Sequence, residues 1–243
     1  MIELIRNAGA VAEESYWLFD AAVAGRVRDF FMTADTSAAV NAYRLEHSLQ
    51  EMAQTALRSL DAVVHRQTDM AANVAAQDAV ADMGVPAPTL DAEIAEDNRL
   101  TVKAASHRIA QILEQDAIMS MRWVRQQMLS IRTAGSRDPQ AMRQEAVRRL
   151  ADGGLRHRAM DRAGRMYGSS ASVRTTVRMA MLDVYLDTYC GVCVGRDVEE
   201  FDVIRDDKAQ QTFNISELGV IRKETFHPNT NCEIKAHSPM SGI

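Results

Sequence analysis

The 243-residue sequence contains few aromatic residues, few prolines and few cysteines, and these scarcities narrow the class of protein. Aromatic residues make up only 5%, whereas alanine and methionine are abundant, so the composition favours packed helices over sheets. Three cysteines, an odd number, do not suit a disulfide framework. No window reaches about 18 uncharged apolar residues and no basic leader precedes an apolar core. We therefore expect a soluble protein made in a reducing cytoplasm, with no membrane segment.

Motifs of the common enzyme classes are also missing. The patterns G-x-G-x-x-G, G-x₄-G-K-[ST], H-E-x-x-H and G-x-S-x-G do not occur. The zinc deaminase pattern fails because no H-x-E is present and Tyr189, not proline, precedes Cys190. We therefore expect no enzyme. A cysteine–histidine nucleophile pair, from Cys190 or Cys232 with His227, is an alternative that the sequence leaves open.

Long stretches without glycine or proline predict a mostly helical fold. Residues 26–83 contain neither residue type, and residues 89–134 form a second such run after the glycine and prolines of 84–88. Apolar residues in the first run recur three or four positions apart, as on one helix face. These residues are Leu45, Leu49, Met52, Ala56, Leu60 and Val63. We expect the two runs to form a long antiparallel helical hairpin or bundle, within a first domain of residues 1–134.

Shorter helices are expected after the hairpin. Asp138 followed by Pro139 predicts a capped helix that continues to about residue 151. A second basic helix is expected over residues 155–166. A last helix, capped by Ser170 or Ser172, leads toward the first cysteine. Residues 135–194 are therefore predicted to form a region of shorter basic helices.

A small α+β module is expected at residues 195–243. Polar and apolar residues alternate over 200–205 and again over 232–237, which predicts two strands. The complete prediction is thus a mostly α protein, with a long helical hairpin or bundle followed by a small module of strands and loops.

Positive charge is concentrated in the middle of the chain. Residues 122–178 contain thirteen arginines and four acidic residues, although the whole chain has a net charge of −5. Such a segment can contact nucleic-acid phosphates or an acidic protein surface. Solvated helix faces that pair with the acidic N-terminal half are the alternative. The candidate contact residues are Arg143, Arg148, Arg149, Arg156, Arg158, Arg162 and Arg165.

The three cysteines all lie in the last 54 positions. Cys190 and Cys193 form a C-x₂-C pair, and Cys232 follows His227 after four residues. Three thiolates and an imidazole make a tetrahedral ligand set for zinc, so Cys190, Cys193, His227 and Cys232 are a candidate metal site. The alternative is that Cys190 and Cys193 are buried thiols on one helix face.

Several features of the C-terminal third occur together in a known family. In chain order they are Arg174-Thr175, Asp187, the Cys190–Cys193 pair, a strand over 195–205, a variable loop, and His227-Pro228-Asn229 leading to Cys232. An aspartate before C-x-x-C and a terminal His-Pro segment with cysteine are typical of the MuF-like minor head proteins of tailed bacteriophages. Over roughly residues 165–240 the chain resembles that family.

The resemblance implies a structural role. Such proteins are present in small copy number inside the capsid near the portal, and they are implicated in head assembly and in DNA packaging or delivery. It therefore implies an oligomeric setting, with the portal or major capsid protein as partner and packaged DNA as a further one. It also implies a location in the virion, after assembly in the host cytoplasm. Two alternatives stay open: a cytosolic nucleic-acid-binding helical protein that uses the arginine-rich middle, and a metal-dependent or toxin-like enzyme.

Overall fold

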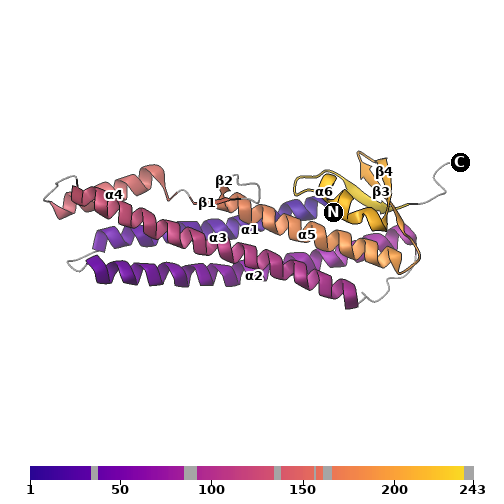
Figure 1. The fold of residues 1–243 in the computed structure, drawn as a ribbon, viewed down its shortest axis with the longest axis horizontal. Helices are drawn as coiled ribbons and strands as arrows, with labels where there is room; N and C mark the ends of the chain where they lie inside the picture. Colours follow the sequence, from indigo (N-terminus) through magenta and orange to yellow (C-terminus); the bar gives the residue numbers. More distant parts are fainter. Residues whose placement is uncertain (34–37, 85–91, 134–137, 156, 161–165, 238–243) are drawn as a thin grey trace. The chain divides into compact units, whose positions relative to one another are not determined.

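The computed structural model describes residues 1–33, 38–84, 92–133, 138–155, 157–160 and 166–237. Within these residues the chain is mostly helical, with a small antiparallel sheet near the C-terminal end, which confirms the predicted fold class (Figure 1). The helices are α1 (Ile2–Thr33), α2 (Ala38–Met83), α3 (Ala92–Thr133), α4 (Pro139–Gly153), α5 (Ser169–Val194), the 3₁₀ helix η1 (Ile215–Glu217) and α6 (Leu218–Glu224). The strands are β1 (Arg158–Met160), β2 (Met166–Gly168), β3 (Glu200–Arg205), β4 (Lys208–Asn214) and β5 (Glu233–Ala236).

Helices α1 and α2 are separate, although residues 26–83 contain no glycine or proline. Helix α1 ends at Thr33, whose hydroxyl donates a hydrogen bond of 2.7 Å to the carbonyl of Asp29. Helix α2 begins at Ala38. The prediction of one helix across 26–83 is therefore wrong. Serine, threonine and aspartate side chains compete for backbone hydrogen bonds, so a helix can end without either of the two strongest helix breakers.

The chain forms two compact units, each assembled from several parts of the sequence. Unit 1 comprises Met1–Ala12, Ala62–Ser106 and Arg174–Ile243, and unit 2 comprises Glu13–Asp61 and His107–Val173. Neither unit coincides with one of the three segments predicted from the sequence, because the long helices contribute residues to both units.

Helix α5 is the central element of unit 1. Nearly all of its side chains from Ala180 to Cys193 are buried, and a helix that is buried on all sides is typical of a protein interior. At Gly191 a β-carbon would lie 2.3 Å from Cδ1 of Ile94, so the absent side chain lets α3 approach closely. The hydroxyl of Tyr185 donates a hydrogen bond of 2.6 Å to Asp78 of α2. Unit 1 is therefore a bundle packed around α5.

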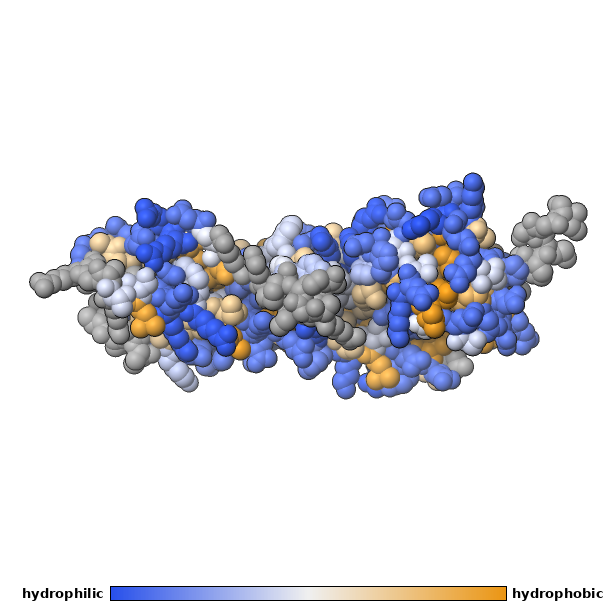
Figure 2. Space-filling model, turned by 45° about the horizontal axis from the view of Figure 1, so that its top comes forward, coloured by the Kyte–Doolittle hydropathy of each residue, from blue (hydrophilic) through white to orange (hydrophobic). Residues whose placement is uncertain are grey.

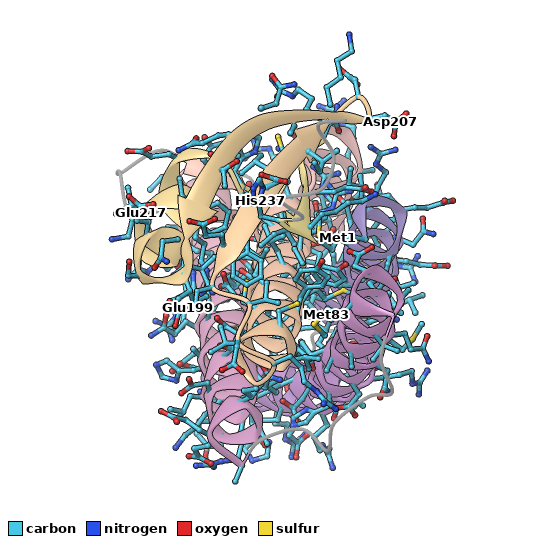
Figure 3. All side chains as sticks on the ribbon, turned by 90° about the vertical axis from the view of Figure 1, so that its right-hand side faces the viewer. Met1, Met83, Glu199, Asp207, Glu217 and His237 are labelled. Carbon is cyan, nitrogen blue, oxygen red and sulfur yellow. The ribbon has the colours of Figure 1, made fainter. Side chains whose placement is uncertain are left out.

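The three-stranded sheet of unit 1 has the order β4-β3-β5. Phe201 and Val203 of β3 pair with Phe213 and Ile234 on one buried face. The backbone N–H of Ala236 in β5 donates to the hydroxyl of Tyr189 at 2.8 Å, which attaches the sheet to α5. Figure 3 shows the strands lying across α5, with Asp207 at the tip of the β3–β4 hairpin.

The predicted strands at 200–205 and 232–237 are confirmed, whereas the stretch expected as a variable loop contains β4. Asp206 and Asp207 form a two-residue turn with positive φ angles of 51° and 59°, a conformation suited to a tight hairpin. The strand after this turn has only one buried side chain, that of Phe213. An exposed edge strand lacks the alternation by which strands are recognised in a sequence.

The apolar core of unit 2 comes from four helices. Arg125 of α3 donates a hydrogen bond of 3.0 Å to Glu46 of α2, so these two helices are neighbours here. Leu45, Leu49 and Leu60 of the predicted stripe are buried. The other buried apolar side chains include Phe19, Val23 and Val27 of α1, Ile109, Ile112 and Leu113 of α3, and Ala146 and Leu150 of α4.

The segment after α3 confirms one prediction and corrects another. Asp138 caps α4, because its side chain accepts a hydrogen bond from the backbone N–H of Gln140 and Pro139 occupies the first turn. The prediction of a second basic helix over 155–166 is wrong. Residues 158–160 and 166–168 instead pair as the antiparallel strands β1 and β2.

Candidate functional site

The predicted zinc ligands are not gathered into a metal site. Cys190 and Cys193 are buried near the end of α5, Cys232 is buried just before β5, and His227 is exposed. Within the residues that the structure describes, no group of three or more histidine, cysteine, aspartate or glutamate side chains is arranged to hold a metal ion. The structure shows the alternative arrangement, in which the C-x₂-C pair consists of core thiols.

Burial also keeps these thiols protonated. Desolvation raises the pKa of Cys190 well above its usual range, and it raises that of Cys193 to about 12, with the charge of Asp82 adding to the shift. The thiolate is both the metal ligand and the nucleophile, so a buried thiol with a raised pKa is inert at neutral pH. Cys190 therefore does not suit the cysteine–histidine nucleophile pair.

Asp187, the aspartate before the C-x₂-C pair, forms an ion pair with Arg222 of α6. Asp183 lies one turn earlier in α5, with its carboxylate 3.5 Å from the same guanidinium. Desolvation raises the pKa of Asp183, although the nearby arginine opposes the shift. An arginine that is paired and partly buried between two helices holds them together, so Asp187 has a structural role in attaching α6 to α5.

The turn that contains His227 lines a pocket in unit 1. Its other walls are the first turns of α1, with Ile2, Ile5 and Arg6, and the middle of α5, with Arg178 and Leu182. The pocket has a volume of about 90 Å³. Two segments singled out from the sequence, the His-Pro-Asn segment and the arginine-bearing last helix, therefore meet at one place.

The side chain of Arg178 passes close to α1 at Gly9. A β-carbon at Gly9 would lie 2.5 Å from Nε of Arg178, so a side chain at this position would require the arginine to shift. Nη1 donates to the side-chain oxygen of Asn229 at 3.0 Å, and Nη2 donates to the carbonyl of Arg6 at 3.4 Å. These two bonds join α5 to the turn 227–230 and to the first turns of α1.

The arginines predicted to contact nucleic acid are only partly described. Both Arg148 and Arg149 of α4 pair with Glu145, at 3.0 and 2.9 Å. Arg149 also donates to side-chain oxygens of α3. The remaining candidates are Arg143 on α4, Arg158 in β1, and Arg156, Arg162 and Arg165, which lie outside the described residues. The carboxylate of Glu145 thus pairs with both Arg148 and Arg149. Contact of these arginines with nucleic acid stays a prediction.

Sequence reasoning missed a buried polar network in unit 2. Asp116 of α3 is fully buried and accepts hydrogen bonds from the hydroxyl of Tyr16 at 2.6 Å and from that of Ser169 at 2.9 Å. Desolvation raises the pKa of Asp116, while these two donors and His157 oppose the shift. Desolvation and the neighbouring carboxylate also raise the pKa of Tyr16.

His157 and Ser120 extend this network. The ring nitrogen Nε2 of His157 lies 2.7 Å from the hydroxyl of Ser120, and Nδ1 lies 2.7 Å from the carboxylate of Asp20. This order of acid, imidazole and hydroxyl is also that of a serine nucleophile. However, Ser120 is fully buried within α3 and its hydroxyl donates to the carbonyl of Asp116 at 2.7 Å. No substrate reaches such a hydroxyl, so we interpret the network as a structural link among three segments.

A sequence signal for this network did exist. Asp116 and Ser120 lie four residues apart on the face of α3 that also carries the buried Ile109, Leu113 and Val124. A polar residue on an otherwise apolar helix face must find a buried partner, so the interruption of the stripe indicates a network. The pattern does not identify the partners, because they come from other helices.

Comparison of the chain with protein-family models, with curated proteins and with solved structures finds no match. Among the described helices, none is both long enough and apolar enough to cross a membrane.

Proposed function

We propose that this chain is a structural protein of a tailed-phage head, namely a minor head protein that acts at or near the portal in head assembly and DNA packaging or delivery. The observation that carries the proposal is that the family-like residues all lie in unit 1 and build one small module. Asp187 pairs with Arg222, the cysteines are buried, and His227 lines a pocket. These motif residues stabilise a folded module, which is consistent with a protein that binds other proteins.

Exposed apolar side chains support a role in assembly. In unit 2, Trp17 is 57% exposed and Tyr43 is 70% exposed, and Leu18 and Leu129 are also exposed. Aromatic side chains are enriched in protein interfaces, so Trp17 and Tyr43 are candidate contact residues. Figure 2 shows separate hydrophobic areas within a mostly hydrophilic surface on the face in view.

The direct test is whether the chain is part of the particle. Phage particles produced from the genome that encodes this chain would be purified and analysed by quantitative mass spectrometry, with the major capsid protein as internal reference. We expect the chain at a small copy number, and we expect it to copurify with the portal protein when both are coexpressed. Absence from purified particles, or a genome without portal and terminase genes, contradicts the proposal.

A second measurement separates this role from the nucleic-acid alternative. The full chain would be titrated with duplex DNA at several salt concentrations. Salt-dependent binding that is lost on replacing Arg148 and Arg149 by glutamine, without incorporation into particles, favours the alternative, because phosphate contacts release counterions.

A further inference from the structure

Helix α1 carries an exposed apolar face within unit 2. On this face Trp17 is 57% exposed and Leu18 is 72% exposed. Ala21 and Ala22, one turn further along the helix, are exposed as well. The other face of α1 already fills the core, and a surface helix normally has charged and polar side chains opposite its core face. The exposed face of α1 is therefore a candidate surface for a second molecule.

Gly25 continues this face by one more turn. Glycine is unfavourable in the interior of a helix, and at Gly9 and Gly191 it has a packing reason, because a β-carbon there would lie 2.5 and 2.3 Å from another side chain. A β-carbon at Gly25 would have no neighbour within 4 Å in the described part of the chain. The space at Gly25 is therefore open to another helix.

Two charged residues lie at equal distances from the centre of this face. Glu14 precedes Ala21 by seven residues and Arg28 follows it by seven, and both are exposed. Seven residues are close to two full turns, so the three residues lie in one line of about 21 Å along α1. Arg28 pairs with the adjacent Asp29 at 3.3 Å, but an exposed pair of this kind is weak and leaves the guanidinium able to bind a second carboxylate.

This line of residues is complementary to itself when two copies of α1 run antiparallel about Ala21. In that register Glu14 of each copy reaches the level of Arg28 of the other, so two ion pairs form. A parallel pair would instead place Glu14 beside Glu14 and Arg28 beside Arg28. A two-fold symmetric dimer uses the same surface of both copies, so it requires this kind of self-complementarity.

We propose that α1 pairs antiparallel with α1 of a second copy of this chain and so forms a two-fold symmetric dimer. Trp17 and Leu18 of one copy lie at the level of Ala24 and Gly25 of the other, so large side chains meet small ones. The contact spans only about four turns of one helix, which suits a dimer of moderate affinity. The inference goes beyond the proposed function and does not depend on it.

The first test measures self-association of the full chain by sedimentation velocity, from low to several hundred micromolar concentration. We expect a monomer–dimer equilibrium. Glu14→Arg and Arg28→Glu each place like charges at both ends of the contact, so each variant should dimerise at least about tenfold more weakly. A mixture of the two variants restores both pairs of opposite charge and should associate nearly as well as the unchanged protein. An unchanged protein that stays monomeric, or a mixture that associates no better than each variant alone, overturns the proposal.

A steric variant tests the close approach at Gly25. Gly25→Leu adds a side chain where a β-carbon has no described neighbour, so the fold should be retained while the second helix is kept away and dimerisation is lost. Arg58→Glu on α2 and Leu129→Ala on α3, both at exposed positions, are the controls and should leave the dissociation constant unchanged. Circular dichroism verifies that each variant is folded. Unchanged dimerisation of Gly25→Leu, or an equal loss in the controls, overturns the proposal.

Disulfide crosslinking tests the register. Ala21→Cys places one thiol of each copy at the centre of symmetry, so mild oxidation should link the dimer. Met32→Cys, also at an exposed position of α1, lies about three turns from the centre and should not link. The three native cysteines are buried, so they do not compete. A protein that dimerises but links through Met32→Cys and not through Ala21→Cys contradicts the antiparallel register.

Discussion

Both units use tyrosine–aspartate hydrogen bonds, but at different depths. In unit 1 the rings of Tyr185 and Tyr189 stack in the core, with centroids 6.1 Å apart, while their hydroxyls reach carboxylates of α2 that are not fully buried. In unit 2 the carboxylate of Asp116 is fully buried together with most of Tyr16. Unit 1 should therefore depend mainly on apolar packing around α5, whereas unit 2 should depend also on complete hydrogen bonding in its centre.

The largest effect is expected from Leu186→Ala in the middle of α5. Leu186 is fully buried, so the change leaves a cavity and should lower the free energy of unfolding by about 2 to 5 kcal/mol. Urea denaturation gives the total, and hydrogen exchange resolved by peptide shows whether the loss of protection begins in unit 1. Leu100→Ala, at a side chain 49% exposed in the same unit, is the control and should cost far less. Equal costs for the two variants would mean that α5 is not the packing centre.

The corresponding change in unit 2 is Asp116→Ala. It leaves the hydroxyls of Tyr16 and Ser169 buried without their acceptor, which should cost about 1 to 3 kcal/mol. Asp116→Asn should cost less, because the amide oxygen still accepts and no charge is buried. Asp29→Ala, at an exposed carboxylate of the same unit, serves as the control in the same denaturation series. The comparison of the units fails if Asp116→Ala is as mild as this control.

Local chemistry explains what could be predicted from the sequence. The cap at Asp138 depends on a hydrogen bond between residues two apart and on the fixed φ of Pro139, so it was predictable. The strands at 200–205 and 232–237 each alternate because one face is buried, and this too is visible in the sequence.

The missed polar network depends on contacts distant in sequence. Tyr16 and Asp116 are 100 residues apart, and no local sequence pattern around either residue identifies the other as its hydrogen-bond partner. The spacing of the cysteines shows which sulfurs can meet one ion but not whether the fold gathers them, and among the described residues the four predicted ligands are not arranged as a metal-holding group, so zinc binding stays a prediction. Strand β4 was missed because a mostly exposed edge strand has no apolar period.

Alkaline pH should weaken unit 1 before unit 2. Burial raises the pKa of Cys190 and Cys193 in the folded state, whereas in the unfolded chain thiols ionise near about 8.5. The folded state then holds protons that the unfolded state has released, so stability is intact below that pH and falls as pH rises. The slope should approach about 1.4 kcal/mol per pH unit for each thiol. Urea denaturation between pH 7 and pH 10 measures it.

The matched variant for this titration is Cys190→Ala with Cys193→Ala. Without the two thiols, the decline should begin only near about pH 10, where tyrosines of the unfolded chain ionise. Burial raises the pKa of Tyr185 and Tyr189 in unit 1 and of Tyr16 in unit 2, so both units should weaken there. A decline that begins at the same pH with and without the thiols would assign the effect to other groups.

The smallest effect is expected at the cap of α4, in unit 2. Asp138→Ala removes the acceptor 2.9 Å from the backbone N–H of Gln140 and should cost about 1 kcal/mol, whereas Asp138→Asn should retain most of the stability because asparagine caps equally well. Asp152→Ala, near the other end of the same helix, is the control and should be neutral or slightly stabilising, since a negative charge there opposes the helix dipole. Hydrogen exchange should show the loss within α4 and leave the amides of α5 in unit 1 protected. A loss that reaches α5 would mean that the two units unfold together, and the contrast between them would then describe packing but not stability.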